Sequence, residues 1–349
     1  MADFRLRPME PSDGPAIDAL MRHEAQTTSV GMTTHYFHDV YAALVAQHPS
    51  LSGVVADSTG SDGLVGMATV YFDDVRLGGR VFPCAHLENL KVHHDVRRQG
   101  LGSRLAGWRI DEAHRRIGSE AVVTAGVEAT NSASLATAHR WSTQVLGPVR
   151  LAIARTAAKP PQNTGVEVRP MADDDIGPVL AGIDTFYAGY DLVPRLTPAG
   201  LTGLLAQTGL GEPLRAYRVA VTGDGTIVAG AGVTERFKLM ADHLDSLPLP
   251  IAFLGRVTGL IPSDRMIRSI EIGLAWHAPG RVDALRTLWD AIRFEWHGRA
   301  NTVVGPADPR GSLIEAFHVG RSFAPRVEIM APVRSPVPLD PNRLLYLWR

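Results

Sequence analysis

The chain has 349 residues, of which 45% are hydrophobic and 20% are charged, and its formal net charge is −1. This composition is that of a globular protein, and the length predicts two domains. A near-neutral charge without a long run of Lys or Arg argues against a nucleic-acid partner. The N-terminus lacks a signal-peptide core, and Pro and Arg256 interrupt the apolar stretch 247–261. We therefore expect no membrane association and a cytoplasmic location.

The first 92 residues predict two helices followed by an antiparallel meander. Apolar periodicity favours helices over 13–23 and 36–47, and β-prone runs favour strands over 51–56, 64–72 and 81–92. The glycines at 78 and 79 predict a tight turn between the last two strands. Cys84 is the single cysteine, so an internal disulfide is excluded, and its apolar neighbours favour a core residue over a nucleophile.

Beyond the meander, the chain passes from strand to helix through a glycine-containing turn. Ala106, Ile110 and Ala113 recur at helical spacing, and Gly118 follows, so we predict a helix over 101–117. The next β-rich run, 121–127, cannot form a tight hairpin with the strand that ends at Val92, because this helix intervenes. The two strands should therefore be parallel neighbours.

The turn before this helix has the features of a phosphate site. Gly100 and Gly102 allow the backbone to approach a ligand closely, and the helix presents unpaired N–H groups and its positive dipole end. No P-loop pattern is present, and Leu105 stands where a dinucleotide fingerprint has its third glycine. An ordinary strand-to-helix turn with solvated arginines remains the alternative.

Residues 97–102, Arg-Arg-Gln-Gly-Leu-Gly, resemble motif A of the GNAT acyltransferase superfamily, whose signature is Arg/Gln-x-x-Gly-x-Gly/Ala after a strand. The surroundings agree with the family, because a strand over 87–92 carries Glu88, and a later strand is followed by Asn131 at the start of a helix. The resemblance implies an α+β fold with a mixed, mostly antiparallel sheet, a central parallel pair and flanking helices.

The resemblance also implies a reaction, the direct attack of a primary amine, preferably of a small molecule, on the thioester of acetyl-CoA. A carboxylate beside the thioester would take the proton of the amine, and Glu88 is the candidate base. A surface glutamate on a half-solvated strand is the alternative reading of Glu88. His86 is the second candidate, ahead of His93 and His94, which are expected to be solvated turn residues.

The acetyl-CoA would lie along the same strand and turn. The backbone N–H of Leu90 is a candidate donor to the developing oxyanion, and amides around the glycines would bind the pyrophosphate, with charge from Arg97 or Arg98. Asn131 would either meet the cofactor, cap its helix, or do both. The predicted cofactor-binding residues are Leu90, Val92, Arg97, Arg98, Gln99, Gly100, Gly102, Ser103, Asn131 and Ser134; no metal is predicted.

One position departs from the family pattern. Many members have a Tyr seven residues after the Asn, where its hydroxyl reprotonates the departing thiolate, but this chain has Ala138. His139 could replace the Tyr, water could supply the proton, or His139 could be purely structural.

The sequence then repeats its outline. Arg7-Pro8-Met9 is echoed by Arg169-Pro170-Met171, each after a short strand, and residues 157–165 read as an exposed linker. We place the boundary near Pro161 and expect a GNAT-like unit over 1–158 that binds acetyl-CoA, and a second unit over 165–349. Expected elements of the second unit are a hairpin of 214–221 with 226–234, strands 268–276 and 301–306, and a helix over 281–296.

The second unit looks like a degenerate copy. Its corresponding turn, 278–283, has one glycine and places Asp283 near the helix start, where it would repel an anion. This unit would be structural or would form the acceptor cleft. The aromatic groups at 186–190 and 344–348 are expected in core or interdomain packing.

Three functions remain open: an N-acetyltransferase for a small amine, a non-catalytic acyl-CoA-binding protein, and an acetyltransferase for protein lysines or N-termini. The motif encodes neither the acyl length nor the choice between monomer and homodimer.

Overall fold

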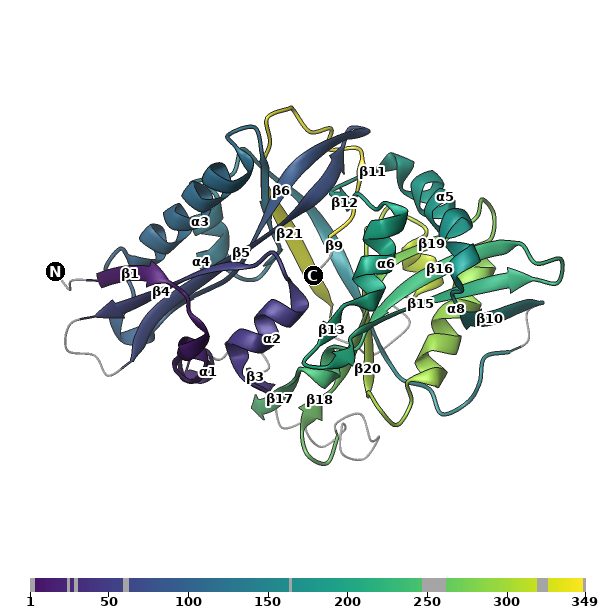
Figure 1. Cartoon of the computed structure of the whole chain (residues 1–349), viewed down its shortest axis with the longest axis horizontal. Helices are drawn as coiled ribbons and strands as arrows, with labels where there is room; N and C mark the ends of the chain where they lie inside the picture. Colours follow the sequence, from purple (N-terminus) through teal and green to yellow (C-terminus); the bar gives the residue numbers. More distant parts are fainter. Residues whose placement is uncertain are drawn as a thin grey trace.

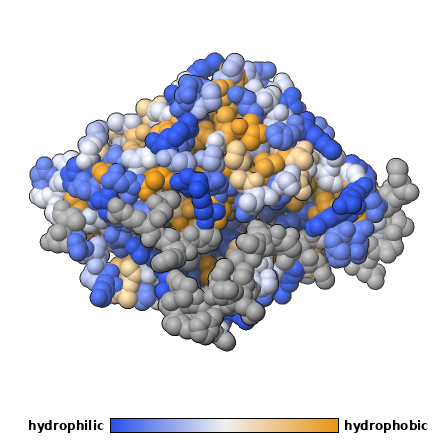
Figure 2. All heavy atoms as spheres, turned by 180° about the vertical axis from the view of Figure 1, so that it is seen from behind, coloured by the Kyte–Doolittle hydropathy of each residue, from blue (hydrophilic) through white to orange (hydrophobic). Residues whose placement is uncertain are grey.

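One mixed β-sheet runs through both halves of the computed structural model, in the order β1-β4-β5-β6-β7-β21-β9-β20-β19-β16-β15-β10 (Figure 1). The structure describes residues 4–23, 26–27, 31–58, 63–162, 165–246, 262–318 and 326–347. The apolar stretch 247–261 lies outside these ranges. Within them, no helix has the length and apolarity that crossing a bilayer requires. Hydrophilic and hydrophobic areas alternate on the face seen in Figure 2.

The N-terminal half confirms the predicted meander. β4 (Ser52–Ser58), β5 (Leu64–Leu77) and β6 (Arg80–Val92) are antiparallel neighbours, and β1 (Phe4–Pro8) pairs with β4. The predicted helix is α3 (Leu101–Ile117). After it, β7 (Val122–Ala125) pairs in parallel with β6, as expected for a strand reached through a helical crossover.

Helices cover both faces of this part of the sheet. α3 packs its apolar stripe on one face, and α1 (Gly14–His23) and α2 (Val40–Gln47) pack on the other. The expected helix over 36–47 is wrong at its start, because residues 31–36 form the strand β3 (Gly31–Tyr36). β3 pairs with β17 (Met240–Ser246) from the distant half of the chain, a long-range contact that local periodicity does not reveal.

The C-terminal half repeats the layout. β10 (Val166–Pro170), β15 (Arg215–Thr222), β16 (Ile227–Thr234) and β19 (Ser269–His277) are antiparallel, and α8 (Val282–Glu295) connects β19 to its parallel neighbour β20 (Thr302–Ala307). α5 (Ile176–Phe186) and α6 (Pro198–Ala206) cover one face. Tyr187, Tyr190 and Tyr346 are buried together, which confirms the packing role expected for the aromatic groups.

The remaining described elements are short. They are β2 (Gln26–Thr27), β8 (Val127–Glu128), α4 (Ser132–Ala138), β11 (Tyr190–Asp191), β12 (Val193–Pro194), β13 (Thr208–Gly209), β14 (Glu212–Pro213), β18 (Met266–Ile267), α9 (Leu313–Ala316) and β22 (Leu344–Leu345), together with single 3-10 turns.

The two halves exchange their last long strands. β21 (Val327–Arg334), from the end of the chain, lies between β7 and β9 (Gln144–Arg155), and β9 pairs in turn with β20. One buried apolar cluster draws on both halves, with Val122 and Val149 packing with Ala331 and Val333. The boundary between the two units, at residues 158–165, stays a prediction from the sequence. In the structure, the sheet of each half contains a strand from the other half.

We therefore expect a chain that ends at Lys159 not to fold by itself, because β7 and β9 lose the strand that bridges them. Circular dichroism should show no cooperative thermal transition for this fragment. Co-expression of residues 1–159 with residues 160–349 should restore one transition. A fragment that melts alone at the temperature of the full chain would contradict the exchange.

The Arg-Pro-Met repeat has a physical counterpart in each half. Arg7 donates to both carboxylate oxygens of Asp13, at 2.8 and 2.7 Å, and Arg169 does so to Asp175, at 2.5 and 3.0 Å. Each carboxylate also accepts a backbone N–H three residues earlier in the chain. The arginine hydrogen bonds hold the pKa of both carboxyl groups below the usual value. Each first strand is thereby tied to the helix that follows it.

We expect Asp13→Asn and Asp175→Asn each to lower the free energy of unfolding by about 2 kcal/mol at pH 7. Because the pKa of each folded carboxyl lies below its unfolded value of 3.8, this stabilisation is complete above that value. It is lost as the pH falls through the lower folded pKa. Denaturant titrations should therefore show a difference at pH 7 that shrinks below pH 3.8.

The exposed Asp111, on α3, provides a matched control. Asp111→Asn should change the unfolding free energy little at any pH. A difference for the Asp13 or Asp175 variants that persists undiminished in acid would contradict the assignment.

Candidate functional site

β6 directs two sets of side chains to opposite faces of the sheet. Ala85 and Leu87 pack against α3, and the alternation of a strand sends His86 and Glu88 to the other face, toward α2. The two predicted catalytic candidates therefore share a face, and both lie away from the helix that follows the glycine turn.

A β-bulge follows Glu88 directly. Thr69 of β5 pairs with Glu88 and Met67 pairs with Lys91, so Ala68 alone opposes Asn89 and Leu90. Asn89 takes φ +48°, a region that Asn tolerates better than most residues, and its side-chain amide donates to the Thr69 hydroxyl at 3.1 Å.

The bulge stands where the parallel pair opens. β6 and β7 are paired from Cys84 with Val122 to Leu87 with Ala125, and β8 then pairs with β21 instead. Beyond this point no β6–β7 pairing exists among the described residues. The backbone of Leu90 and Val92 thus lies on the edge that has separated from β7, which is where the sequence placed a ligand.

Three aromatic rings are stacked beside Glu88. The ring of Tyr71 lies between His48, at 3.9 Å between centroids, and His86, at 4.5 Å, with planes within 13° and 8° of parallel. His48, at the end of α2, places Nε2 3.7 Å from a Glu88 carboxylate oxygen. Burial, with smaller effects of Arg215 and His86, lowers the pKa of His48 to about 3. Its imidazole is therefore neutral near pH 7, and the contact is not an ion pair.

His86 differs from His48 in its protonation state. Its Nε2 lies 2.7 Å from Asp73 Oδ1. Burial acts to lower the pKa of His86, but the hydrogen-bonded Asp73 carboxylate favours the cation, and the net shift raises the pKa. A protonated imidazole paired with a carboxylate is poorly suited to remove a proton from an amine.

Arg109 approaches Glu88 from the α3 side of the sheet. It is 5% exposed and donates from Nη1 to the backbone oxygen of Glu88 at 3.2 Å. Burial lowers the pKa of its guanidinium to about 10, so it remains charged near neutrality. Sequence reasoning missed both Arg109 and His48, because each reaches Glu88 only through tertiary packing.

The glycine turn has the conformation that its residues suggest. Arg98 takes φ +63° and Gly100 φ +87°, and no side chain caps the start of α3 at Gly100. Arg98, Gln99, Gly100 and Ser103 are exposed there, and Arg97 donates back to the carbonyl of Val92 at 3.3 Å. The first-turn N–H groups of α3 thus face outward at the positive end of a 17-residue helix.

The turn after α4 adds a third arginine to this site. Asn131 caps α4, because its Oδ1 accepts the Ser134 N–H at 3.0 Å, so the N-cap reading of Asn131 is confirmed. At the other end of α4, Arg140 donates to the hydroxyl of Ser103 at 2.8 Å. Ala138 is buried and His139 is exposed at the helix end.

Two groups of possible metal ligands occur among the described residues: Asp73, Cys84 and His86, and the turn residues His93, His94 and Asp95. In the first, the thiol of Cys84 is fully buried, and burial raises its pKa, which disfavours a thiolate ligand. The prediction that the protein uses no metal stays a prediction. The buried position confirms Cys84 as a core residue.

The corresponding turn of the second half differs. The Arg281 guanidinium lies 3.3 Å from the carboxylate of Asp283, which sits in the first turn of α8. The protein's own anion therefore occupies the electrostatic position that a phosphate would need.

Comparison with known proteins agrees with this geometry. Residues 17–141 match the model of the acetyltransferase (GNAT) family, and no curated protein sequence matches the chain. Saccharomyces cerevisiae N-myristoyltransferase with bound myristoyl-CoA superposes with a TM-score of 0.64 and 11% identity, over 96% of this chain and 84% of that one.

Two further structures match over nearly the whole length of both chains. The GCN5-related N-acetyltransferase from Sphaerobacter thermophilus gives a TM-score of 0.61 and 15% identity, covering 97% of each chain. A tandem GNAT protein from the clavulanic acid biosynthesis pathway gives 0.59 and 15%, covering 97% of this chain and 100% of that one. At these identities the likeness shows the fold, and it confirms the α+β architecture with two GNAT-like halves. Residues 17–141 thus match the acetyltransferase (GNAT) family, and the fold of the whole chain is that of two tandem GNAT-like halves.

Proposed function

We propose that the N-terminal half binds acetyl-CoA and transfers its acetyl group to a primary amine of a small molecule, with Glu88 as the general base. One observation carries the proposal: Glu88 immediately precedes the bulge at which β6 leaves β7, and the uncapped start of α3 follows on the same chain segment. A carboxylate, an opened strand pair and an anion-binding helix end are thereby arranged in sequence.

The pyrophosphate of the donor binds at the start of α3. The N–H groups of Leu101, Gly102 and Ser103 supply hydrogen bonds, and Arg98 and Arg140 supply charge. Arg98 adopts a left-handed backbone conformation that is unfavourable for a non-glycine residue, as is common where a loop is shaped for a ligand.

The pantetheine arm lies along the separated edge of β6, where the backbone of Leu90 and Val92 supplies its hydrogen bonds. The amine attacks the thioester carbonyl, and the Leu90 N–H stabilises the negative charge that develops on the oxygen. Glu88 accepts the proton of the amine, the new C–N bond forms, and the C–S bond breaks to release the coenzyme A thiolate. Water or His139 returns a proton to that sulfur, since Ala138 has no acidic group.

Neutral His48 is a positioning residue in this scheme. Stacking on Tyr71 holds the imidazole against Glu88 without placing a second charge there. His86, the alternative base, is better explained as a cation held by Asp73. Asp283, in the first turn of α8, disfavours a phosphate there and so supports a single acetyl-CoA site, in the first half of the chain.

We expect Glu88→Gln to lower kcat/KM for the best amine by about 100- to 10,000-fold, because the proton acceptor is lost. Release of free thiol from acetyl-CoA, measured with a panel of small amines, gives the rate. Calorimetry should show unchanged affinity for coenzyme A, since the side chain does not bind the donor.

The exposed Glu120, which follows α3, offers the control, and Glu120→Gln should behave as wild type. A fully active Glu88→Gln variant would contradict the assigned base. Donor binding without turnover on any small amine, peptide or protein would support a non-catalytic role. Preference for myristoyl-CoA or for peptide N-termini would favour a function like the N-myristoyltransferase relative.

We expect Arg140→Met to weaken coenzyme A binding by about 5- to 30-fold, because one charge-assisted contact to the pyrophosphate is removed. Calorimetry at two salt concentrations should show a smaller salt dependence than that of wild type. Arg195→Met, at an exposed arginine of the second half, should leave the affinity unchanged. Equal affinities for Arg140→Met and wild type would place the pyrophosphate elsewhere.

A further inference from the structure

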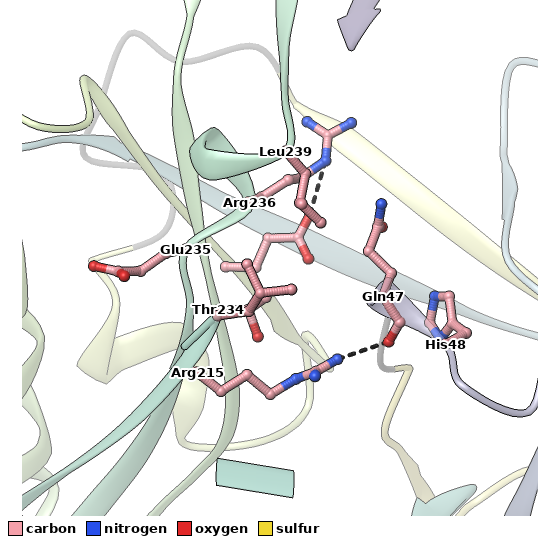
Figure 3. A pocket seen from close by; sticks show the side chains of 9 residues that line it. Gln47, His48, Arg215, Thr234, Glu235, Arg236 and Leu239 are labelled. Atoms are coloured by element: carbon pink, nitrogen blue, oxygen red, sulfur yellow. Dashed lines mark hydrogen bonds and ion pairs between the residues drawn. The ribbon is translucent and has the colours of Figure 1, made fainter. Parts of the chain in front are cut away.

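A polar pocket lies between the two halves, next to His48. Gln47 and His48, from the end of α2, form one side, and Arg215, Thr234 and Arg236 of the second half form much of the other (Figure 3). Glu271 also lines the pocket. As the side chains stand, the pocket has room for about one water molecule, so a larger ligand enters only when the lining side chains move. Because His48 also lies 3.7 Å from Glu88, the pocket adjoins the proposed base.

Three polar atoms of this lining are buried without a hydrogen-bond partner in the part of the chain that the structure describes. They are Nε2 of Gln47, Nε of Arg215 and Oγ1 of Thr234. The Thr234 residue is only 9% exposed. Buried polar groups in folded proteins are nearly always paired, and leaving one unpaired costs about 1–3 kcal/mol. Three such groups at one opening indicate a ligand that supplies the missing acceptor atoms.

The charged side chains of the lining indicate the sign of the charge on that ligand. Arg236 is compensated, since it lies 2.8 Å from Asp242 and 3.5 Å from Glu271. Arg215 instead donates to neutral oxygens, the backbone carbonyl of Gln47 at 2.9 Å and the side-chain amide of Gln207. Within the described ranges no carboxylate is in ion-pair contact with Arg215. Burial lowers the pKa of Arg215, and the charge of Glu271, in the same lining, raises it with a smaller effect. A guanidinium without a directly bonded carboxylate favours an anionic ligand.

We infer that this pocket holds the carboxylate of the acceptor, so that the acceptor class is an amine that also carries a carboxylate, as amino acids do. The inference rests on the proposed function, since it makes the pocket the acceptor site of the same reaction. Arg215, Gln47 and Thr234 donate to the carboxylate, and the amine extends past His48 to Glu88. Each half of the chain thereby supplies one end of the site: the base from the first, the main cation from the second.

The test compares matched amines: standard amino acids, their carboxamides and their decarboxylated counterparts, each assayed for thiol release from acetyl-CoA. The best amino acid should exceed its decarboxylated form in kcat/KM by about 100-fold. Arg215→Met should remove about 10- to 100-fold of this preference through KM, leaving the rate on the decarboxylated amine within about twofold of wild type. Arg195→Met, at the exposed arginine, should keep the full preference.

A second variant separates recognition from folding. Thr234→Val removes an unpaired hydroxyl and breaks no internal hydrogen bond, so the melting temperature should not fall. Its KM for the amino acid should nevertheless rise about 3- to 10-fold, while coenzyme A affinity stays unchanged.

The outcomes distinguish this inference from the proposed function. Equal turnover of amino acids and decarboxylated amines, or an Arg215→Met variant that slows both alike, would overturn the carboxylate site and leave the acetyltransferase intact. If no amine is acetylated, the proposed function fails, and calorimetry of amino acids with the coenzyme-A-saturated protein decides the inference. Binding that Arg215→Met abolishes would support the carboxylate site, and no binding would refute it.

Discussion

The extra residue at Asn89 is the constraint on which the candidate site depends. A regular β6 would stay in register with β5 and could continue its parallel pairing with β7, which would close the edge that carries Leu90 and Val92. The bulge also ends the alternation that places His86 and Glu88 on one face. The hydrogen bond from Asn89 to Thr69 fixes this geometry from inside the sheet, where Thr69 is fully buried.

The second half contributes more than a cover. Its β17 pairs with β3 of the first half, its β12 with β5, and its β21 fills the gap between β7 and β9. The pocket that adjoins His48 is lined from both halves, and Arg215 donates across it to the carbonyl of Gln47 at the end of α2. The acetyl-CoA side of the proposed site thus lies within one half. The side that would bind the amine is formed by both halves.

Features encoded by neighbouring residues could be predicted from the sequence. α3, the parallel partner β7, the glycine turn and the cap at Asn131 all follow from helical periodicity, crossover geometry and the preferences of Gly and Asn. Features that depend on distant partners could not. The strand β3 was not predicted, and the expected helix began at its last residue, Tyr36. The strands β9 and β21 gave no sign of their exchange.

The same distinction holds within the site. Glu88 was found because a local pattern marks its strand, but its assigned role stays a proposal. His48, Arg109 and Arg140 each reach the site from another element, and Arg215 comes from the other half. No spacing rule connects them to the glycines. For the repeated Arg-Pro-Met, local sequence indicated the repeat, and only the structure revealed the ion pairs behind it.

The exchanged strands have a consequence for how such a chain can change over generations. After a duplication, one copy is free to lose its own ligand turn, as residues 278–283 suggest for the second half. The second half cannot be deleted without loss of the fold, because its terminal strand β21 lies inside the sheet of the first half. Splitting the gene at the linker would leave each product with an open sheet edge. Mutual dependence of this kind keeps both halves together in one chain, even if only one of them were to bind a ligand.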